Sequence, residues 1–367
     1  MRRFSRRQIA LPALIVLLAF GLRVWAIGWG LPYADHPDEP AVSNVALGML
    51  KRGDWDPRTF VYPSLYYNLL RATFTAHWAF GKSRGLYADM AQLPATTDVY
   101  VTVPGFFIWG RLLTLALGVL TVGLALLIGW RWLGERAGLL GGLLLAILPY
   151  HMRHSQYITT DVATGLTALL ALGGALLVLD SGSWRRYALA GFAAGLAAGT
   201  KYNAGAVVLA LSAAHGLHWG RASLRQFRRL PWAALWSLLG FVATTPYAAL
   251  HFAEFMRTGP TAVLAHYGAA LHGDVIGSWP VGAYLDWFWR EGLQPLPFLA
   301  MLFGAWTLWR RRSKPALVLA AFVVPSTLLA LSQPMHFFRN LLPVLPPLCL
   351  VAGAGAAEAA ELAAAWL

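Results

Sequence analysis

Ten apolar stretches run through this chain of 367 residues and constrain its fold more than any other feature. A helix needs about 20 mostly apolar residues to cross the hydrocarbon core of a membrane. The span is helical because lipid provides no hydrogen-bond partners for the backbone. The stretches are Ile9–Leu31, Pro104–Trp130, Ala137–Tyr150, Val162–Leu179, Ala188–Thr200, Ala204–Leu217, Pro231–Leu250, Pro295–Trp309, Ala316–Leu331 and Leu341–Ala364. They predict an all-α polytopic membrane protein, a single domain of residues 1–367 with about ten transmembrane helices. The fifth and sixth stretches are either two spans or one long helix broken at residues 200–203.

Composition supports the membrane class and excludes a soluble one. Apolar residues make up 58% of the chain and charged residues only 12%, against roughly half and a quarter in soluble domains. The formal charge of +13 would suggest nucleic acid in a soluble chain. Here the basic residues stand in short runs between apolar stretches, where they are typical of cytoplasmic loops that face membrane lipids. No nucleic-acid partner is expected.

The basic runs also set an orientation for the chain. Four arginines lie within Met1–Arg7, so this end resembles a signal peptide, but we interpret the first apolar stretch as an uncleaved helix with its start in the cytoplasm. Alternating the spans from there places every strong basic cluster inside. These clusters are Arg131 with Arg136, Arg185 with Arg186, Arg221–Arg229, and Arg310–Arg312 with Lys314. The sequence therefore predicts a multi-pass cell-membrane protein whose polar site faces the periplasm or the extracellular side.

Two outer segments are long enough to carry structure of their own. The first, residues 32–103, contains two amphipathic stretches, Ala41–Leu50 and Ser64–Phe80, that we expect to form helices in the plane of the membrane interface. The second, residues 251–294, holds Trp279, Trp287 and Trp289. Several other polar segments also fall on this outer side, which predicts that they converge on one site.

Asp38 and Glu39 are the most unusual pair on that side, since adjacent carboxylates at a membrane surface repel each other and the acidic headgroups. Pro37 and Pro40 flank them, so one carboxylate can face a cavity while the other turns away. A carboxylate within reach of a hydroxyl can act as a general base. The alternative is an acidic turn that caps the helix after it.

Three cations near the outer ends of apolar stretches are candidates for binding a phosphate: Arg111, Lys201 and Arg339. Each can instead be an interfacial anchor whose charged end reaches water. Lys201 is the most suggestive, because the chain has only four lysines and this one lies between Gly- and Ala-rich stretches. Tyr62, Tyr202 and His336 occur in the same outer segments and are candidate substrate contacts.

A divalent metal ion is a further candidate ligand, although no cofactor is required by any motif. His151, His154 and Asp161 could supply ligands, but their spacing is not that of a standard zinc site, and polar residues satisfied within a short loop are the alternative. The lone Cys349 lies in an apolar run, which excludes a disulfide framework.

In their order along the chain, these segments resemble the GT-C superfamily of membrane glycosyltransferases. They are most similar to the bacterial relatives of protein O-mannosyltransferases and to the lipid A aminoarabinose transferases. The matching motifs are His36–Pro40, Tyr62–Tyr66, Gly110–Leu112, Gly134–Leu139, Ser155–Asp161, Gly199–Asn203 and Arg339–Pro343. Two features depart from the family: Asn340 stands where the last motif usually has Tyr, and many relatives are longer.

The resemblance implies an inverting transfer of a sugar from a polyprenyl-phosphate carrier to a hydroxyl of a glycan, lipid or protein acceptor. By that similarity Asp38 is the base, with Glu39 beside it, and Arg111, Lys201 and Arg339 are candidates for the carrier phosphate. Asp161 matches the second acidic position of the family. A lipid or sugar transporter or flippase is the main alternative, but charges clustered at one face favour an enzyme over the midplane charges of transporters. A structural scaffold would leave the carboxylates without a role.

Overall fold

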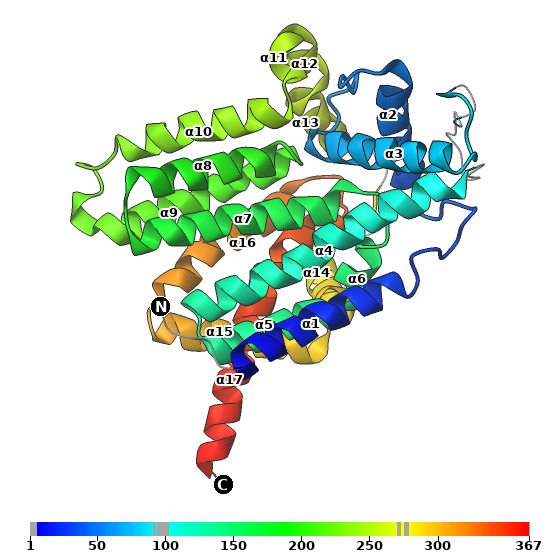
Figure 1. The fold of residues 1–367 in the computed structure, drawn as a ribbon. Helices are drawn as coiled ribbons and strands as arrows, with labels where there is room; N and C mark the ends of the chain where they lie inside the picture. The colour runs from blue at the N-terminus through cyan, green and yellow to red at the C-terminus, as the bar shows by residue number, and fades with distance from the viewer. Residues whose placement is uncertain (1–5, 91–92, 94–102, 270–272, 275–278, 367) are drawn as a thin grey trace.

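The computed structural model describes residues 6–90, 93, 103–269, 273–274 and 279–366. Within these ranges the secondary structure is helical and contains no β-strand, which confirms the all-α class (Figure 1). The helices up to α9 are α1 (Arg6–Val24), α2 (Asp38–Arg52), α3 (Leu65–Ser83), α4 (Pro104–Trp132), α5 (Glu135–Ile147), α6 (Pro149–His154), α7 (Thr160–Asp180), α8 (Trp184–Ala198), η2 (Tyr202–Val207) and α9 (Val208–Trp219). The others are η3 (Gly220–Ala222), α10 (Arg229–Thr244), α11 (Tyr247–Leu250), α12 (Phe252–Thr258), α13 (Pro260–Gly268), α14 (Pro280–Trp287), η4 (Phe288–Gly292), α15 (Pro295–Arg310), α16 (Lys314–Ser332), η5 (Phe338–Val344) and α17 (Leu345–Trp366).

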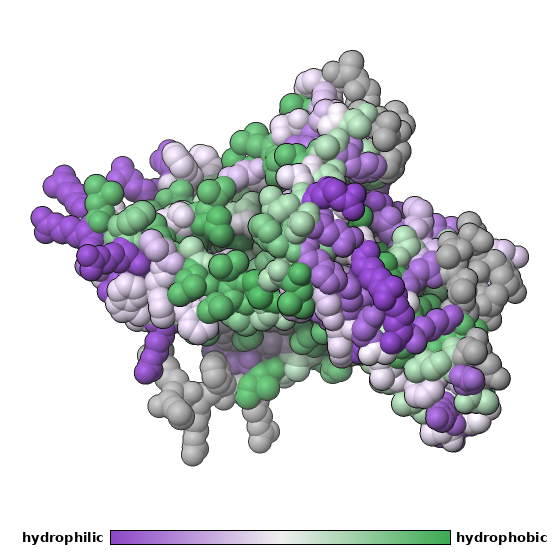
Figure 2. Space-filling model, turned by 90° about the horizontal axis from the view of Figure 1, so that it is seen from above, coloured by the Kyte–Doolittle hydropathy of each residue, from purple (hydrophilic) through white to green (hydrophobic). Residues whose placement is uncertain are grey.

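Each of the ten predicted spans coincides with helix in this structure. Four are long and apolar enough to cross a membrane by length and composition: α4, α7, α16 and the continuous stretch Phe338–Ala365. The other predicted spans form shorter helices, and as membrane crossings they stay a prediction. Seen from above, apolar side chains form a broad band across the middle of the molecule, with hydrophilic side chains toward its ends (Figure 2).

Helix α7 lies at the centre of the bundle. It packs against α4, α8, α9 and η5, and 72% of its most apolar 18-residue window is buried. Small residues allow this crowding, since Gly, Ala and Thr let neighbouring backbones approach closely. The first residues of α7 are Thr160 and Asp161, so the central helix carries an acidic side chain at one end.

Small residues in Gly191–Gly199 allow a close contact between α8 and α10. A Cβ atom added at Gly191 would collide with the carbonyl oxygen of Ala233, and one at Gly195 would collide with that of Ser237. No larger side chain fits between these backbones without separating the helices. The close packing holds the end of α8, and with it the turn at Thr200 and Lys201.

Helices α8 and α9 are two antiparallel elements, which decides between the two alternatives for residues 188–217. The indole nitrogen of Trp219, at the end of α9, donates to the Tyr187 hydroxyl near the start of α8 at 3.2 Å. The chain therefore reverses at residues 199–203 and does not continue as one broken helix. This reversal places Lys201 at the end of the bundle, where two helices meet.

The two amphipathic stretches of the first outer segment form α2 and α3, as predicted. They share a small apolar core with the start of α4, in which Tyr66, Phe74 and Phe106 are almost fully buried. Both helices lie at one end of the bundle, and the α7–α8 and α9–α10 connections lie at the other (Figure 1). Part of each long outer segment falls outside the described residues.

Candidate active site

The two adjacent carboxylates at the start of α2 point in different directions. Asp38 lines a cavity, whereas the Glu39 side chain is completely buried in the protein. The Asp38 amide donates to Nδ1 of His36 at 3.2 Å, so this ring nitrogen carries no proton. Burial lowers the pKa of His36, which keeps the imidazole neutral for this bond. The expectation that one carboxylate faces a cavity and the other turns away is met.

Glu39 is paired with Arg111 of α4 in the protein interior. Nε and NH2 of Arg111 donate to the two Glu39 carboxylate oxygens at 2.9 and 2.7 Å, and NH1 donates to the carbonyls of Ile27 and Trp29. The Ile158 amide also donates to Glu39 at 3.0 Å. With the Glu39 and Arg111 side chains only 0% and 1% exposed, neither group can reach a ligand in this arrangement. Our expectations of Glu39 as a catalytic group and Arg111 as a phosphate contact therefore disagree with the structure.

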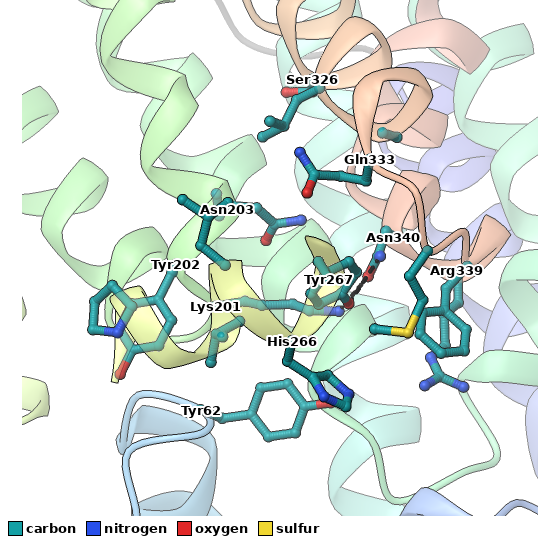
Figure 3. Close-up of a pocket in the computed structure, with 18 of the residues that line it drawn as sticks. Tyr62, Lys201, Tyr202, Asn203, His266, Tyr267, Ser326, Gln333, Arg339 and Asn340 are labelled. Atoms are coloured by element: carbon teal, nitrogen blue, oxygen red, sulfur yellow. Dashed lines mark hydrogen bonds between the residues drawn. The ribbon is translucent and has the colours of Figure 1, made fainter. Parts of the chain in front are cut away.

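The cavity that Asp38 lines has a volume of about 650 Å³. Figure 3 shows polar side chains of this cavity from the loop before α3, the turn after α8, helix α13, helix α16 with the residue after it, and η5. With Asp38 at the start of α2, the polar lining residues are Tyr62, Lys201, Tyr202, Asn203, Thr258, His266, Tyr267, Ser326, Gln333, Arg339 and Asn340. Helix α16 supplies an apolar wall with Phe322, Leu329 and Ala330. The cavity is thus charged in one part and hydrocarbon-like in another.

Lys201 connects the cavity to the central helix. Its ammonium donates to Asp161 Oδ1 of α7 at 2.7 Å and to Asn340 Oδ1 at 2.8 Å. The ring of Tyr62 lies 5.8 Å from the same ammonium. Burial lowers the pKa of Lys201, but the Asp161 carboxylate raises it further, so the net shift is upward and the amine stays protonated. A lysine with three hydrogens and two such acceptors keeps one hydrogen for the cavity.

Arg339 stands at the start of η5, beside Asp38. One guanidinium nitrogen lies 3.1 Å from Asp38 Oδ2, and the guanidinium carbon lies 4.4 Å above the Phe337 ring. Helix η5 carries Arg339, and its neighbouring residue Phe338 stacks on the ring of Trp287, with ring centroids 5.4 Å apart. This contact holds the start of η5 in place. The Phe338 amide also donates to an Asp274 carboxylate oxygen at 2.7 Å. The backbone of this segment is therefore held in place, and Asp38 and Phe337 contact the guanidinium at the end of the side chain.

Two other predicted substrate contacts line the cavity, and one does not. Tyr62 and Tyr202 are lining residues, and the Tyr202 hydroxyl donates to the Phe60 carbonyl at 2.7 Å, which fixes its ring. His336 is outside the lining residues: it is buried, and its Nδ1 lies 3.2 Å from the Tyr284 hydroxyl. The expectation of a substrate contact at His336 therefore disagrees with the structure.

The three candidate metal ligands do not form one site. His151 Nδ1 contacts Arg23 NH2 at 2.9 Å in a buried network, and Asp161 is engaged by Lys201. His154 packs against the ring of Tyr150 at 4.6 Å. Among the residues that the structure describes, no three His, Cys, Asp or Glu side chains are grouped as metal ligands. A charged guanidinium beside His151 would also oppose a cation, so these residues do not fit a metal ion.

Comparison with known proteins assigns this arrangement to a known fold. The sequence model of the family described as dolichyl-phosphate-mannose-protein mannosyltransferase matches residues 101–249. The structure of ArnT from Cupriavidus metallidurans bound to undecaprenyl phosphate superposes with a TM-score of 0.63 at 19% identity. It covers 94% of this chain. The chain has the GT-C glycosyltransferase fold.

Other solved structures share the GT-C fold with this chain. The archaeal oligosaccharyltransferase AglB from Archaeoglobus fulgidus, in complex with an inhibitory peptide and a dolichol-phosphate, gives a TM-score of 0.60 at 13% identity, with 96% of this chain covered. The arabinosyltransferase EmbB from Mycobacterium smegmatis gives 0.54 at 17% identity, with 98% covered. Together these comparisons confirm the predicted GT-C resemblance at the level of the fold.

The chain is shorter than the proteins it resembles. The matched part is 59% of ArnT, 50% of AglB and 31% of EmbB. None of the curated proteins compared by sequence matches the chain. The shared feature is therefore the helical GT-C core.

One residue of the cavity was not anticipated from the sequence. Tyr267 of α13 accepts a hydrogen bond from the Asn340 amide at 3.1 Å, and its backbone carbonyl accepts one from Met335 at 3.2 Å. Asn340, which stands in place of the usual Tyr, thus connects Lys201 to a tyrosine hydroxyl from another element. The only local pattern that could have indicated a site at Tyr267 is the adjacent pair His266 and Tyr267, in an outer segment that also contains several tryptophans.

Proposed function

We propose that the chain is an inverting glycosyltransferase that moves a sugar from a polyprenyl-phosphate carrier to an acceptor hydroxyl. One observation carries the proposal: a single cavity presents the Asp38 carboxylate and the cations Lys201 and Arg339 in one part, and the apolar wall of α16 in another. A lipid-linked sugar has the same division, with an anionic phosphate between a hydrocarbon chain and a polar sugar.

Lys201 and Arg339 would hold the carrier phosphate. In a partly dry site, fixed positive charge stabilises the negative charge that develops on a leaving phosphate. Both side chains are mostly buried, at 10% and 19% exposure, so water screens them little. The structure of ArnT is bound to undecaprenyl phosphate, and that of AglB is in complex with a dolichol-phosphate. The wall of α16 would take the first isoprene units.

Asp38 would act as the general base. As the acceptor oxygen forms its bond to the anomeric carbon, its proton passes to the Asp38 carboxylate. The bond from that carbon to the phosphate oxygen breaks on the opposite side, and the electron pair leaves with the phosphate. The carboxylate also eases the positive charge of an oxocarbenium-like transition state. Inversion follows, because attack and departure occur on opposite faces.

Tyr62 and Tyr202 are suited to contact the donor sugar, which would lie between the Asp38 base and the carrier phosphate. Tyr62 and Tyr202 line this part of the cavity, and aromatic rings present an apolar face with a polar edge. The Tyr202 ring is held by its bond to the Phe60 carbonyl. The acceptor is a hydroxyl of a glycan, lipid or protein that approaches from the α2 side.

Sugar transfer is tested with purified protein in detergent and a panel of undecaprenyl-phosphate-linked sugars that includes mannose. Release of undecaprenyl phosphate, measured by chromatography, reports turnover. We expect Asp38→Asn to lose transfer with an unchanged melting temperature. Asp35→Asn, which removes an exposed carboxylate three residues away, serves as the matched control and should keep full activity. A folded Asp38→Asn protein that turns over at the wild-type rate excludes the base role.

A further inference from the structure

Asp38 and Arg339, the proposed base and one of the proposed phosphate ligands, neutralise each other in this structure. An Arg339 NH2 atom and an Asp38 carboxylate oxygen are 3.1 Å apart. The Asp38 oxygen that faces Arg339 is engaged by the guanidinium, so it is not free to accept a hydrogen bond from an acceptor hydroxyl. A guanidinium that faces a carboxylate is in turn less available to another anion.

The charges around the cavity balance without a ligand. Lys201 is paired with Asp161, and Arg339 is paired with Asp38, so two cations face two carboxylates. The phosphodiester of a sugar carrier adds one negative charge to this neutral set. Within a site of low dielectric, burying an added negative charge is costly unless a cation leaves its carboxylate partner and pairs with that charge. Opening one of the two ion pairs turns a second cation toward the phosphate, beside the hydrogen that Lys201 keeps for the cavity, and lets the phosphate bind more tightly.

The pair formed by Asp38 and Arg339 is the one able to open. The side chains of Lys201 and Asp161 are 10% and 3% exposed, and Lys201 is held further by Asn340. Those of Arg339 and Asp38 are 19% and 24% exposed and meet at a longer distance, 3.1 against 2.7 Å. A guanidinium has five N–H donors, so Arg339 can begin to bind an anion before it leaves Asp38. Its stacking on Phe337 stays in place meanwhile.

We infer that the donor phosphate replaces Asp38 as the ion-pair partner of Arg339. This exchange leaves the Asp38 carboxylate available to accept the proton of the acceptor hydroxyl. The inference rests on the proposed function and adds a regulation of the same site. The base becomes active only once the donor is bound. Without donor, Arg339 holds Asp38 in an ion pair and keeps it from deprotonating other hydroxyls.

The exchange predicts an unusual effect on binding. Asp38→Asn removes the competitor for Arg339, so this inactive variant should bind undecaprenyl phosphate several-fold more tightly than the wild-type protein does. Binding is measured by fluorescence titration in detergent, with undecaprenol as the uncharged probe, whose affinity should not change. Asp35→Asn removes the same charge from the same segment outside the cavity lining and should leave both affinities unchanged.

Measuring the effect of Asp38→Asn in an Arg339→Ala protein distinguishes exchange of the ion-pair partner from simple repulsion between Asp38 and the phosphate. We expect Arg339→Ala to bind undecaprenyl phosphate more weakly, and Asp38→Asn to bring a smaller gain in that background than in the wild-type protein. An Asp38→Asn protein that binds no more tightly than wild type overturns the exchange, as does an equal gain in both backgrounds. Loss of sugar transfer by Asp38→Asn would still support the base role, so the two proposals fail separately. If the wild-type protein does not bind undecaprenyl phosphate at all, both are wrong.

Discussion

Glu39 and Arg111 form a bidentate ion pair that is sealed inside the protein, one residue away from the carboxylate that lines the cavity. The pair joins the start of α2 to α4 and, through the Ile158 amide, to the loop before α7. It thereby fixes the direction of α2 and the position of Asp38. The role that this assigns to Glu39 is structural.

Glu39→Gln should therefore lower stability. Removing one partner of a buried ion pair leaves an uncompensated charge, which costs about 3–5 kcal/mol. A fall in the melting temperature in detergent would measure it, and combining Glu39→Leu with Arg111→Met should restore most of the loss. Glu361→Gln breaks an exposed pair with Arg136 and is the control, with little change expected. An unchanged melting temperature for Glu39→Gln together with lost sugar transfer would return Glu39 to a catalytic role.

Lys201→Ala should weaken donor binding. Loss of a charged hydrogen bond costs about 1.5–3 kcal/mol, which corresponds to a rise of roughly 10- to 100-fold in the donor KM. Lys82→Ala provides the comparison, because Lys82 lies on α3 over the ring of Trp78 and outside the cavity lining.

The same substitution strands a buried carboxylate, so a second variant is needed to separate binding from folding. Lys201→Ala combined with Asp161→Asn removes both charges and should recover the melting temperature without recovering the donor KM. A KM that returns to the wild-type value in this double variant would argue against a phosphate contact at Lys201.

The orientation of the chain can be tested by labelling single cysteines. The chain has one cysteine, Cys349, and it is buried, so Ser83→Cys and Ser183→Cys each introduce one accessible thiol. Ser83 ends α3, which lies at one end of the bundle, and Ser183 lies in the α7–α8 connection at the opposite end. A membrane-impermeant maleimide added to intact cells should label Ser83→Cys and spare Ser183→Cys. The reverse pattern would place the candidate site in the cytoplasm.

The sequence identified charged residues of the cavity, but it could not tell a residue that faces a ligand from one in a buried ion pair. Lys201, Arg339 and Asp38 could be found because an ionisable group beside an apolar span is costly and needs a reason. The same argument also selected Arg111, and there it could not separate a ligand contact from a buried ion pair. That distinction depends on Glu39, 72 residues away in sequence, whose direction is set by the packing of α2 on α3 and of α3 on α4.

The misassigned residues share one cause. His151 and His336 are polar groups near helix ends, as functional residues are, but their Nδ1 atoms contact Arg23 and Tyr284 inside the protein. Tyr267 was missed for the opposite reason, since nothing in its local pattern shows that α13 reaches Asn340, 73 residues later. Contacts over such distances follow from how helices pack, and local patterns do not encode them.

By itself, the sequence determined a helical membrane protein, because long apolar stretches span lipid as helices, and predicted that its outer polar segments converge on one site. It also indicated that one of the adjacent carboxylates can face a cavity while the other turns away. Only the tertiary structure decided which carboxylate lines the cavity and which cations share it. The reason is that a charge near a membrane has two outcomes, pairing in the core or facing a ligand, and the outcome depends on partners that folding alone brings within about 3 Å.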